Sequence, residues 1–338
     1  MKIEKQKRMK WSTHITIKED KGYLKHDSPM LFIGSCFADN IGTYLQKAKF
    51  AIELNPYGTL YNPESIAMAI ERLISGEEYT TEELQKSGDI WYSYHHHGKF
   101  STTSAATTLQ GINQSFRRCS TMMKRCERLI VTFGTAYVYR LKCNGKTVAN
   151  CHKQPSTLFT RTRLQVEEIV ACWEKILSQL ASHAPQCQVL FTVSPIRHMS
   201  DGAHDNQLSK STLLLAIDEL CQRHGNQCSY FPAYEIVLDE LRDYRFYDED
   251  MVHPSSQAVS YIYERLSDTY FTEETRSLAE RCLKIDRSLH HRPINGTDNE
   301  AYRSFARKLI EQMQETERAH AGISYRNEIE ELKQIISQ

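Results

Sequence analysis

The sequence has no long apolar run: its longest hydrophobic stretches have strand length, far below the roughly 20 residues that cross a bilayer. The basic segment Met1 to Lys10 is not followed by the apolar core of a signal peptide. No charge excess is present either, because 42 basic residues balance 42 acidic ones. The glycines form neither G-x-G-x-x-G nor a P-loop. We therefore expect no membrane and no nucleic acid as partner, and no bound nucleotide.

Paired cysteines are also missing. The ten cysteines are scattered along the chain, and none forms a C-x-x-C pair. With no secretion signal recognised, this pattern favours reduced thiols and a cytoplasmic location.

What is present is typical of a globular α/β chain. Of 338 residues, 40% are hydrophobic and 25% are charged, which predicts one domain of roughly 250 residues and a helical tail. Apolar runs predict strands at Leu31–Gly34, Phe50–Leu54, Leu129–Gly134, Gln188–Pro195 and Ser229–Pro232. Helical spacing lies between most of them, at Pro63–Ser75, Leu164–Ala181, Leu208–Arg223 and Ser255–Tyr270. The alternation predicts a mostly parallel sheet covered by helices on both faces.

Two regions depart from this alternation. Tyr137–Leu141 and Lys146–Asn150 flank a turn and predict a small hairpin inserted beside the site. Beyond Tyr270 strand signals cease, and a break at 295–298 precedes helices expected at Glu300–Gln314 and Arg326–Ser337. We expect a catalytic domain at 25–275 and a helical extension at 276–338, whose surface is a candidate oligomer contact.

The stretch Gly34-Ser35-Cys36-Phe37-Ala38 is the most informative part of the chain. It follows the apolar run of the first strand and precedes an amphipathic segment from Asp39 to Phe50, so it predicts a strand, a tight turn and a helix. A serine in that turn faces outward N–H groups and the positive end of a helix dipole. About 215 residues later, Asp250 and His253 supply an acid and a base three positions apart. This combination predicts a serine hydrolase.

The chemistry explains why these residue types belong together. A serine hydroxyl is a weak nucleophile until a base takes its proton, and an imidazole does this near neutral pH. A carboxylate fixes the imidazole tautomer, and aimed donors stabilise the oxyanion. The alternatives to catalysis are structural. Ser35 could serve simply as the N-cap of the helix, and His253-Pro254 could simply begin the next helix. Cys36 is a rival nucleophile, although a residue following such a turn is expected to point inward.

The motifs resemble those of the GSCFA family, which is similar to the larger SGNH (GDSL-like) hydrolase group. Besides the turn, the resemblance includes Asn55-Pro56-Tyr57-Gly58-Thr59, the segments 132–136, 150–153 and 194–198, and Asp250 through Pro254, and spans about residues 25–270. It implies a flavodoxin-like, three-layer α/β/α fold with Ser35 as nucleophile and His253 and Asp250 completing the catalytic set. It also implies an oxyanion hole from the N–H groups of Ser35 and Gly58. The Gly-x-Asn of the third block is absent here, and Thr135 or Asn150 could replace that donor.

Other polar residues are candidates for substrate binding. Arg197 and His198 follow a strand, so they lie at the carboxyl edge where ligands bind in open sheets. Arg197 could hold a carboxylate or phosphate, or form a surface salt bridge. His152 follows Asn150 and Cys151 and is a further candidate. In His95-His96-His97, strand alternation would align two imidazoles, which favours a cleft wall or plain surface over a metal site. We therefore expect no metal and no cofactor.

Together these features predict a serine esterase that hydrolyses a small acyl ester, an acetyl ester being one candidate, with a small molecule or a carbohydrate as substrate. The alternatives are an acyltransferase and a catalytically silent protein that binds a carbohydrate or acyl ligand.

Overall fold

The computed structural model describes residues 12–290 and 300–337. Its centre is a five-stranded sheet in which every pairing is parallel. The strand order is β10-β9-β5-β1-β2. The strands are β1 (Met30–Gly34), β2 (Ile52–Leu54), β5 (Arg128–Phe133), β9 (Gln188–Val193) and β10 (Cys228–Tyr230). All five predicted strands are therefore confirmed.

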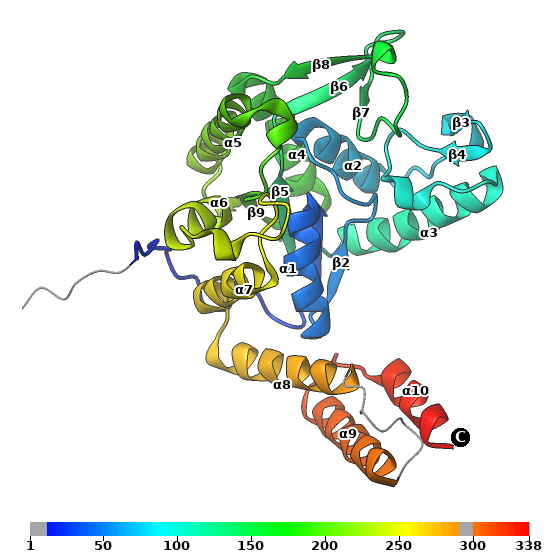
Figure 1. Ribbon diagram of the computed structural model, residues 1–338, viewed down its shortest axis with the longest axis vertical. Helices are drawn as coiled ribbons and strands as arrows, with labels where there is room; N and C mark the ends of the chain where they lie inside the picture. Colours follow the sequence, from blue (N-terminus) through cyan, green and yellow to red (C-terminus); the bar gives the residue numbers. More distant parts are fainter. Residues whose placement is uncertain (1–11, 291–299, 338) are drawn as a thin grey trace, which may run out of the picture.

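Helices cover both faces of the sheet (Figure 1). One face packs against α2 (Pro63–Ser75), α3 (Ala105–Met123), α4 (Val166–His183) and α5 (Ala203–Arg223). The other packs against α1 (Cys36–Lys47), α6 (Ala233–Glu235) and α7 (Ser256–Tyr270). The strands are buried on both sides: in β1, Leu31 and Ile33 join the first cluster, while Met30 and Phe32 join the second. The predicted three-layer α/β/α fold is confirmed.

The strand order determines where a site can form. β2 lies on one side of β1, and β5, β9 and β10 follow in turn on the other. The chain therefore adds β2 on one side of β1 and all later strands of this sheet on the other side. In doubly wound sheets, ligands bind at the carboxyl ends of the two strands where this change of side occurs, here β1 and β5. The segment after β1 is the turn that contains Ser35.

The predicted hairpin is present but is part of a larger unit. β6 (Tyr137–Leu141) pairs with β7 (Thr147–Val148) and, on its other side, with β8 (Phe159–Arg163), all antiparallel. A further two-stranded pair, β3 (Gln85–Ser87) and β4 (Ile90–Tyr92), was not predicted. Figure 1 shows these additions at the same end of the molecule.

The C-terminal region is helical, as expected. α8 (Glu273–Leu289) begins the predicted helical extension, although no separate helix was predicted there. It packs against α1 and leads to α9 (Glu300–Ala319) and α10 (Arg326–Ser337). The three helices share a hydrophobic cluster of their own and project from the α/β body at the end opposite to β6–β8 (Figure 1). The expected break at 295–298 lies outside the described residues. None of the described helices has the length and apolar character needed to span a bilayer.

Candidate active site

The turn between β1 and α1 is built around Gly34. Its φ is +149°, and a side chain there would bring Cβ within 2.3 Å of the Thr132 carbonyl oxygen, so only glycine fits. The buried side chain of Asn55 accepts a hydrogen bond from Gly34 N at 2.8 Å and donates to Asp39 at 2.7 Å. The motif after β2 therefore holds the turn in place.

Ser35 is the N-cap of α1. Its Oγ accepts a hydrogen bond from the N–H of Phe37 at 3.3 Å, and the residue is only 1% exposed. The capping role that the sequence left open is thus present. The hydroxyl lies at the positive end of the helix dipole, at the carboxyl end of β1.

Asp250 and His253 form a hydrogen-bonded pair in the loop before α7. Asp250 Oδ2 lies 2.5 Å from His253 Nδ1, and Oδ1 accepts the N–H groups of Val252 and His253 at 2.9 Å each. The His253 N–H first, and then its imidazole and the Val252 N–H, lower the pKa of Asp250 to about 2. The carboxylate stays ionised at neutral pH and directs Nε2 away from itself.

Nε2 of that imidazole approaches Cys36, with 3.8 Å between Nε2 and Sγ. Cys36 is half-buried and does not point inward, which corrects the expectation from the turn. Burial raises the pKa of its thiol. His253 therefore faces the turn, but its nearest partner there is the residue after Ser35.

One cavity of about 370 Å³ contains these groups. Ser35 and Cys36 line it from the turn, and His253 lines it from the loop before α7. The other polar walls come from the segments after β2, β5 and β9 and from the β6–β8 sheet; they include Asn62, Thr135, Arg161, Ser194, Arg197 and His198. The cavity therefore opens at the carboxyl edge of the sheet.

Of the predicted substrate-binding residues, Arg197 and His198 line this cavity and His152 does not. Burial, followed by the nearby Lys210, lowers the pKa of His198 to about 4. His152 Nε2 lies 2.8 Å from the Ser93 carbonyl oxygen, and its ring packs on Tyr92 at 4.4 Å. His152 is thus held outside the cavity by contacts with the β4 region.

The predicted oxyanion donors are only partly brought together. Gly58 donates its N–H to the Asn55 carbonyl oxygen at 2.8 Å and packs under His97, and it is not among the residues that line the cavity. Asn150 also lies outside that lining, since its side-chain oxygen accepts the N–H of His152. Thr135 does line the cavity, with its hydroxyl 3.1 Å from that of Ser209. Of the three, only Thr135 is among the residues that line the cavity, and its hydroxyl oxygen also accepts the N–H of Tyr137 at 3.1 Å.

The three consecutive histidines lie in a turn and not on a strand. His96 is fully buried, stacked on Tyr57 at 4.7 Å and edge-on to Tyr79 at 4.7 Å. His97 caps a short 3₁₀ turn, and His95 lies edge-on to Tyr79. The alternation argument was wrong here because the strand ends before the histidines begin.

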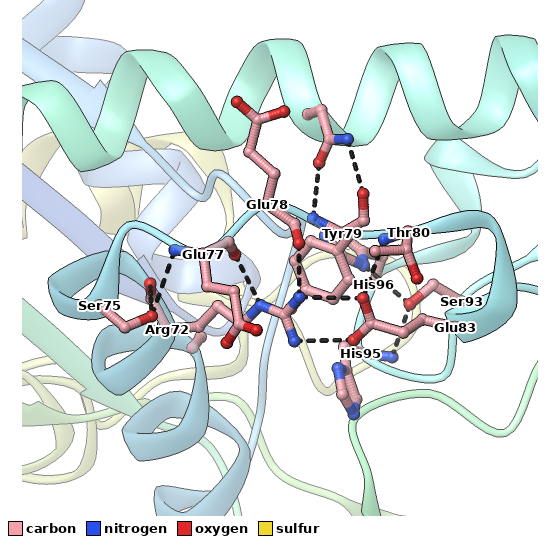
Figure 2. A network of polar contacts seen from close by, with 12 residues as sticks. Arg72, Ser75, Glu77, Glu78, Tyr79, Thr80, Glu83, Ser93, His95 and His96 are labelled. Carbon is pink, nitrogen blue, oxygen red and sulfur yellow. Dashed lines mark hydrogen bonds and ion pairs between the residues drawn. The ribbon is translucent and has the colours of Figure 1, made fainter.

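An arginine network lies beside these histidines (Figure 2). Arg72 donates to the carbonyl oxygens of Glu77 and Glu78 and pairs with both carboxylate oxygens of Glu83. Its guanidinium also stacks on Tyr79, 4.1 Å from the ring centroid. Four hydrogen bonds and the contact with the Tyr79 ring hold this guanidinium within the protein, which favours a structural role for the network.

Asn62 is a cavity residue that the sequence analysis missed. It caps α2 by accepting the N–H of Ser65 on Oδ1 at 2.8 Å, and it is 5% exposed. Within the described part of the chain, its Nδ2 has no acceptor. Because Oδ1 faces the helix, Nδ2 remains available to the cavity that Asn62 lines. An Asn directly before Pro63 was a visible capping signal, but capping alone gave no hint of the cavity.

Lys210 is a second missed residue. It is completely buried, and its ammonium donates to the carbonyl oxygens of Gly134 at 2.6 Å and Ser194 at 2.7 Å. It thus ties together the carboxyl ends of β5 and β9. Burial lowers its pKa to about 7. Its position was detectable, since it continues the apolar stripe of α5 that includes Leu213 and Ile217.

His253 also lines a second cavity, of about 790 Å³. The other walls come from α1, α7 and α8, and they include Tyr44 stacked on Tyr263 with ring centroids 5.1 Å apart. The imidazole is therefore shared by the Ser35 cavity and a larger one that extends to the first C-terminal helix.

Comparison with known proteins bears on the family of the chain. Among solved structures, one similar chain is an acetyl xylan esterase (Est2A) from the rumen bacterium Butyrivibrio proteoclasticus, with 11% identity and a TM-score of 0.34. The match covers 76% of this chain and 64% of that one, so the chain spans less than two thirds of the structure it matches. No curated protein matches.

Family models give the clearer result. Residues 282–338 match the C-terminal domain of GSCFA domain proteins. Residues 29–266, which contain Ser35, Asp250 and His253, match the GSCFA family. The chain therefore belongs to the GSCFA family.

Proposed function

We propose that this protein is a serine esterase that cleaves a small acyl ester, with Ser35 as nucleophile, His253 as base and Asp250 as the group that orients the base. The observation that carries the proposal is the Asp250–His253 pair, whose imidazole lines the same cavity as the buried Ser35 at the start of α1. A hydrogen-bonded acid and base beside a serine at a helix N-terminus is the arrangement that acyl transfer requires.

In the proposed reaction Ser35 Oγ attacks the acyl carbon and its proton passes to His253 Nε2. The tetrahedral intermediate then expels the alcohol, which takes that proton, and water releases the acyl group from Ser35 by the reverse proton path. In the described conformation Oγ faces the N–H of Phe37, so rotation about the Cα–Cβ bond must precede attack. Unliganded sites commonly hold such groups out of line.

The oxyanion needs donors, and the side-chain amide of Asn62 is the best candidate. Asn62 lines the cavity, its Nδ2 has no acceptor among the described residues, and its Oδ1 is held by the α2 cap. We propose that Asn62 supplies the donor that the missing third-block Asn would give. The N–H groups of the first turn of α1 add positive potential at the same place.

The two cavities suggest where the acyl part and the alcohol part of an ester bind. We assign the acyl group to the smaller cavity, where Ser35 lies, and the alcohol to the larger one. This follows because His253, which must protonate the leaving alcohol, lines both. A small acyl group such as acetyl suits this scheme, and the larger cavity leaves room for an alcohol of carbohydrate size. If a second alcohol replaces water there, the same residues act as an acyltransferase.

Cys36 is a second candidate nucleophile, favoured by the 3.8 Å between its Sγ and His253 Nε2. Burial opposes this role because it raises the pKa of the thiol and so disfavours the thiolate. We therefore place Ser35 first.

Hydrolysis of 4-nitrophenyl acetate by two single variants tests the proposal. Ser35→Ala should abolish turnover above the uncatalysed rate, while Cys36→Ala should retain most of it. Activity that survives in Ser35→Ala and disappears in Cys36→Ala would move the nucleophile to the thiol. If the wild-type protein turns over no ester but binds acetylated sugars, the silent binding function is correct instead.

A further inference from the structure

We propose that the acyl group of the substrate carries a carboxylate, and that Arg197 binds it. This inference rests on the proposed esterase function and adds the substrate class. It follows from the charges around the smaller cavity.

Arg197 enters the cavity with its hydrogen-bonding capacity unused. It follows β9 and lines the cavity together with Ser35 and His253. Its Nε is buried and has no hydrogen-bond partner. Within residues 12–290 and 300–337, no carboxylate pairs with its guanidinium. Arg197 therefore does not form the expected surface salt bridge with any described residue. A buried donor without an acceptor costs free energy unless a ligand supplies the acceptor.

The other arginine in the cavity is already neutralised. Arg161 pairs with Asp201, whose side chain is 9% exposed, and its guanidinium lies 3.8 Å from the ring centroid of Tyr137. Asp201 is also the only carboxylate among the residues lining this cavity. The one available counter-charge is thus taken by Arg161, and none is left for Arg197.

A second cation adds to the imbalance. Lys210 lies fully buried behind the cavity, and its ammonium is bonded to two neutral carbonyl oxygens. Arg197 lies close enough to contribute to the lowered pKa of Lys210. Arg197 has no carboxylate partner, and neither has Lys210, whose pKa of about 7 leaves it partly charged at neutral pH. The cavity therefore has a positive potential, which a substrate anion would balance.

A carboxylate fits this geometry better than a neutral polar group. The planar guanidinium presents parallel N–H groups that match two carboxylate oxygens. His198 is uncharged at neutral pH, since its pKa is lowered to about 4, so it adds a neutral hydrogen-bonding wall and no competing charge. The position of Arg197 in the cavity assigned to the acyl group places the carboxylate on the acid part of the ester.

Two matched ester pairs test the inference. The 4-nitrophenyl monoester of adipate and 4-nitrophenyl hexanoate share a leaving group and a six-carbon chain, and differ in a terminal carboxylate. We expect kcat/KM to favour the adipate ester by about tenfold or more. In the second pair, 4-acetoxybenzoate and its methyl ester, the charge lies on the alcohol part. A preference in this pair alone would overturn the assignment to the acyl side, and no preference in either pair would overturn the whole inference.

Variants of Arg197 connect any preference to this side chain. Arg197→Gln should reduce the ratio of kcat/KM between the adipate and hexanoate esters by about tenfold, mainly through KM of the charged ester. Arg197→Lys keeps a positive charge without the planar fork and should give an intermediate ratio. Arg118→Gln is the matched control, because this arginine pairs with Glu53 and is not among the residues that line the cavity, and it should leave the ratio unchanged. An unchanged ratio in Arg197→Gln would contradict the assignment.

Binding of adipate itself separates this inference from the esterase function. Isothermal titration calorimetry on Ser35→Ala should detect adipate, and Ser35→Ala/Arg197→Gln should bind it about tenfold more weakly. If Ser35→Ala binds adipate but the wild-type protein hydrolyses neither ester, the esterase proposal fails and the anion site remains. If both esters are hydrolysed equally and adipate does not bind, the anion site fails and the esterase remains.

Discussion

At the scale of a single residue, the hydroxyl of Ser35 has a structural role besides the catalytic one that we propose. In the described conformation it accepts the N–H of Phe37 and caps α1. Losing an N-cap typically costs about 1 kcal/mol. Ser35→Ala should therefore lose activity while remaining folded, and this separation makes the variant informative.

Substitutions of the acid–base pair should have graded effects. His253→Ala removes the proposed base and should lower kcat by about a thousandfold or more. Asp250→Asn removes the charge that faces Nδ1, yet it leaves an oxygen that can accept the N–H groups of the loop, so we expect a smaller loss. Steady-state kinetics with 4-nitrophenyl acetate measures both. Full activity in His253→Ala would exclude this histidine as the base.

The pH dependence of kcat/KM should show one acid limb. Asp250, with its pKa near 2, stays ionised through the physiological range, and His198, with its pKa near 4, stays neutral. A general base must be unprotonated to accept the serine proton, so kcat/KM should fall on the acid side. A rate that is flat from pH 5 to about pH 8 would contradict this mechanism.

Asn62 offers a test of the proposed oxyanion donor with an internal control. Ser is also a good N-cap, so Asn62→Ser should preserve the start of α2 while removing the amide donor. We expect kcat to fall by about a hundredfold, as it does when one oxyanion donor is removed, with a similar melting temperature. Unchanged kcat in a folded Asn62→Ser variant would rule out this role.

The sequence predicted the Asp250–His253 pair better than it predicted the surroundings of that pair. Asp250 and His253 could be paired because three positions in a turn suffice to join them. Gly58 could not be placed, because where its N–H points depends on how the loop after β2 folds back on Asn55. Lys210 was missed because a charged residue on an apolar helix stripe is usually assigned to the surface.

At the scale of elements, buried strands were the most predictable feature. A short, near-continuous apolar run bounded by turns is typical of a buried strand and fits few other structures. Helix α3 was missed, and α8 was predicted only as part of the helical extension. The buried faces of these helices include polar residues, such as Thr108 and Asn113 in α3, so their apolar stripes are weak. The strand β8 was missed because its residues between Phe159 and Arg163 are exposed and carry no alternating apolar pattern.

The β1–α1 turn should tolerate no side chain at Gly34. An alanine there would combine a strained φ of +149° with a Cβ 2.3 Å from a backbone oxygen. We expect Gly34→Ala to lower the free energy of unfolding by about 3 kcal/mol or more, measured by urea denaturation. Gly98→Ala is the matched control, because Gly98 has open space around its missing Cβ, and it should change stability by less than about 1 kcal/mol.

At the scale of the whole molecule, five histidines should make the fold sensitive to acid. Burial is the largest cause that lowers the pKa of each of them: His26, His95, His96, His152 and His198. In the unfolded chain these histidines bind a proton near pH 6.5, whereas in the folded protein they bind it only at lower pH. The free energy of unfolding therefore falls as the pH drops below about 6.5. Each histidine contributes a slope of at most about 1.4 kcal/mol per pH unit in that window.

Melting temperatures at several pH values between 7 and 5 measure this effect. We expect a steady fall toward pH 5, before most carboxylates titrate. His26→Gln should reduce the slope, because its side chain cannot take up the proton in either state. A melting temperature that is constant over this range would contradict the assignment of these histidines as neutral in the folded protein.

Covalent labelling with a fluorophosphonate, followed by peptide mapping, tests the central claim most directly. The probe forms a stable bond with an activated serine and reports the nucleophile without a known substrate. Our account predicts one adduct on Ser35 that is lost in His253→Ala and retained in Cys36→Ala. An adduct on another residue, or ester hydrolysis by a protein in which Ser35 is never labelled, would contradict it.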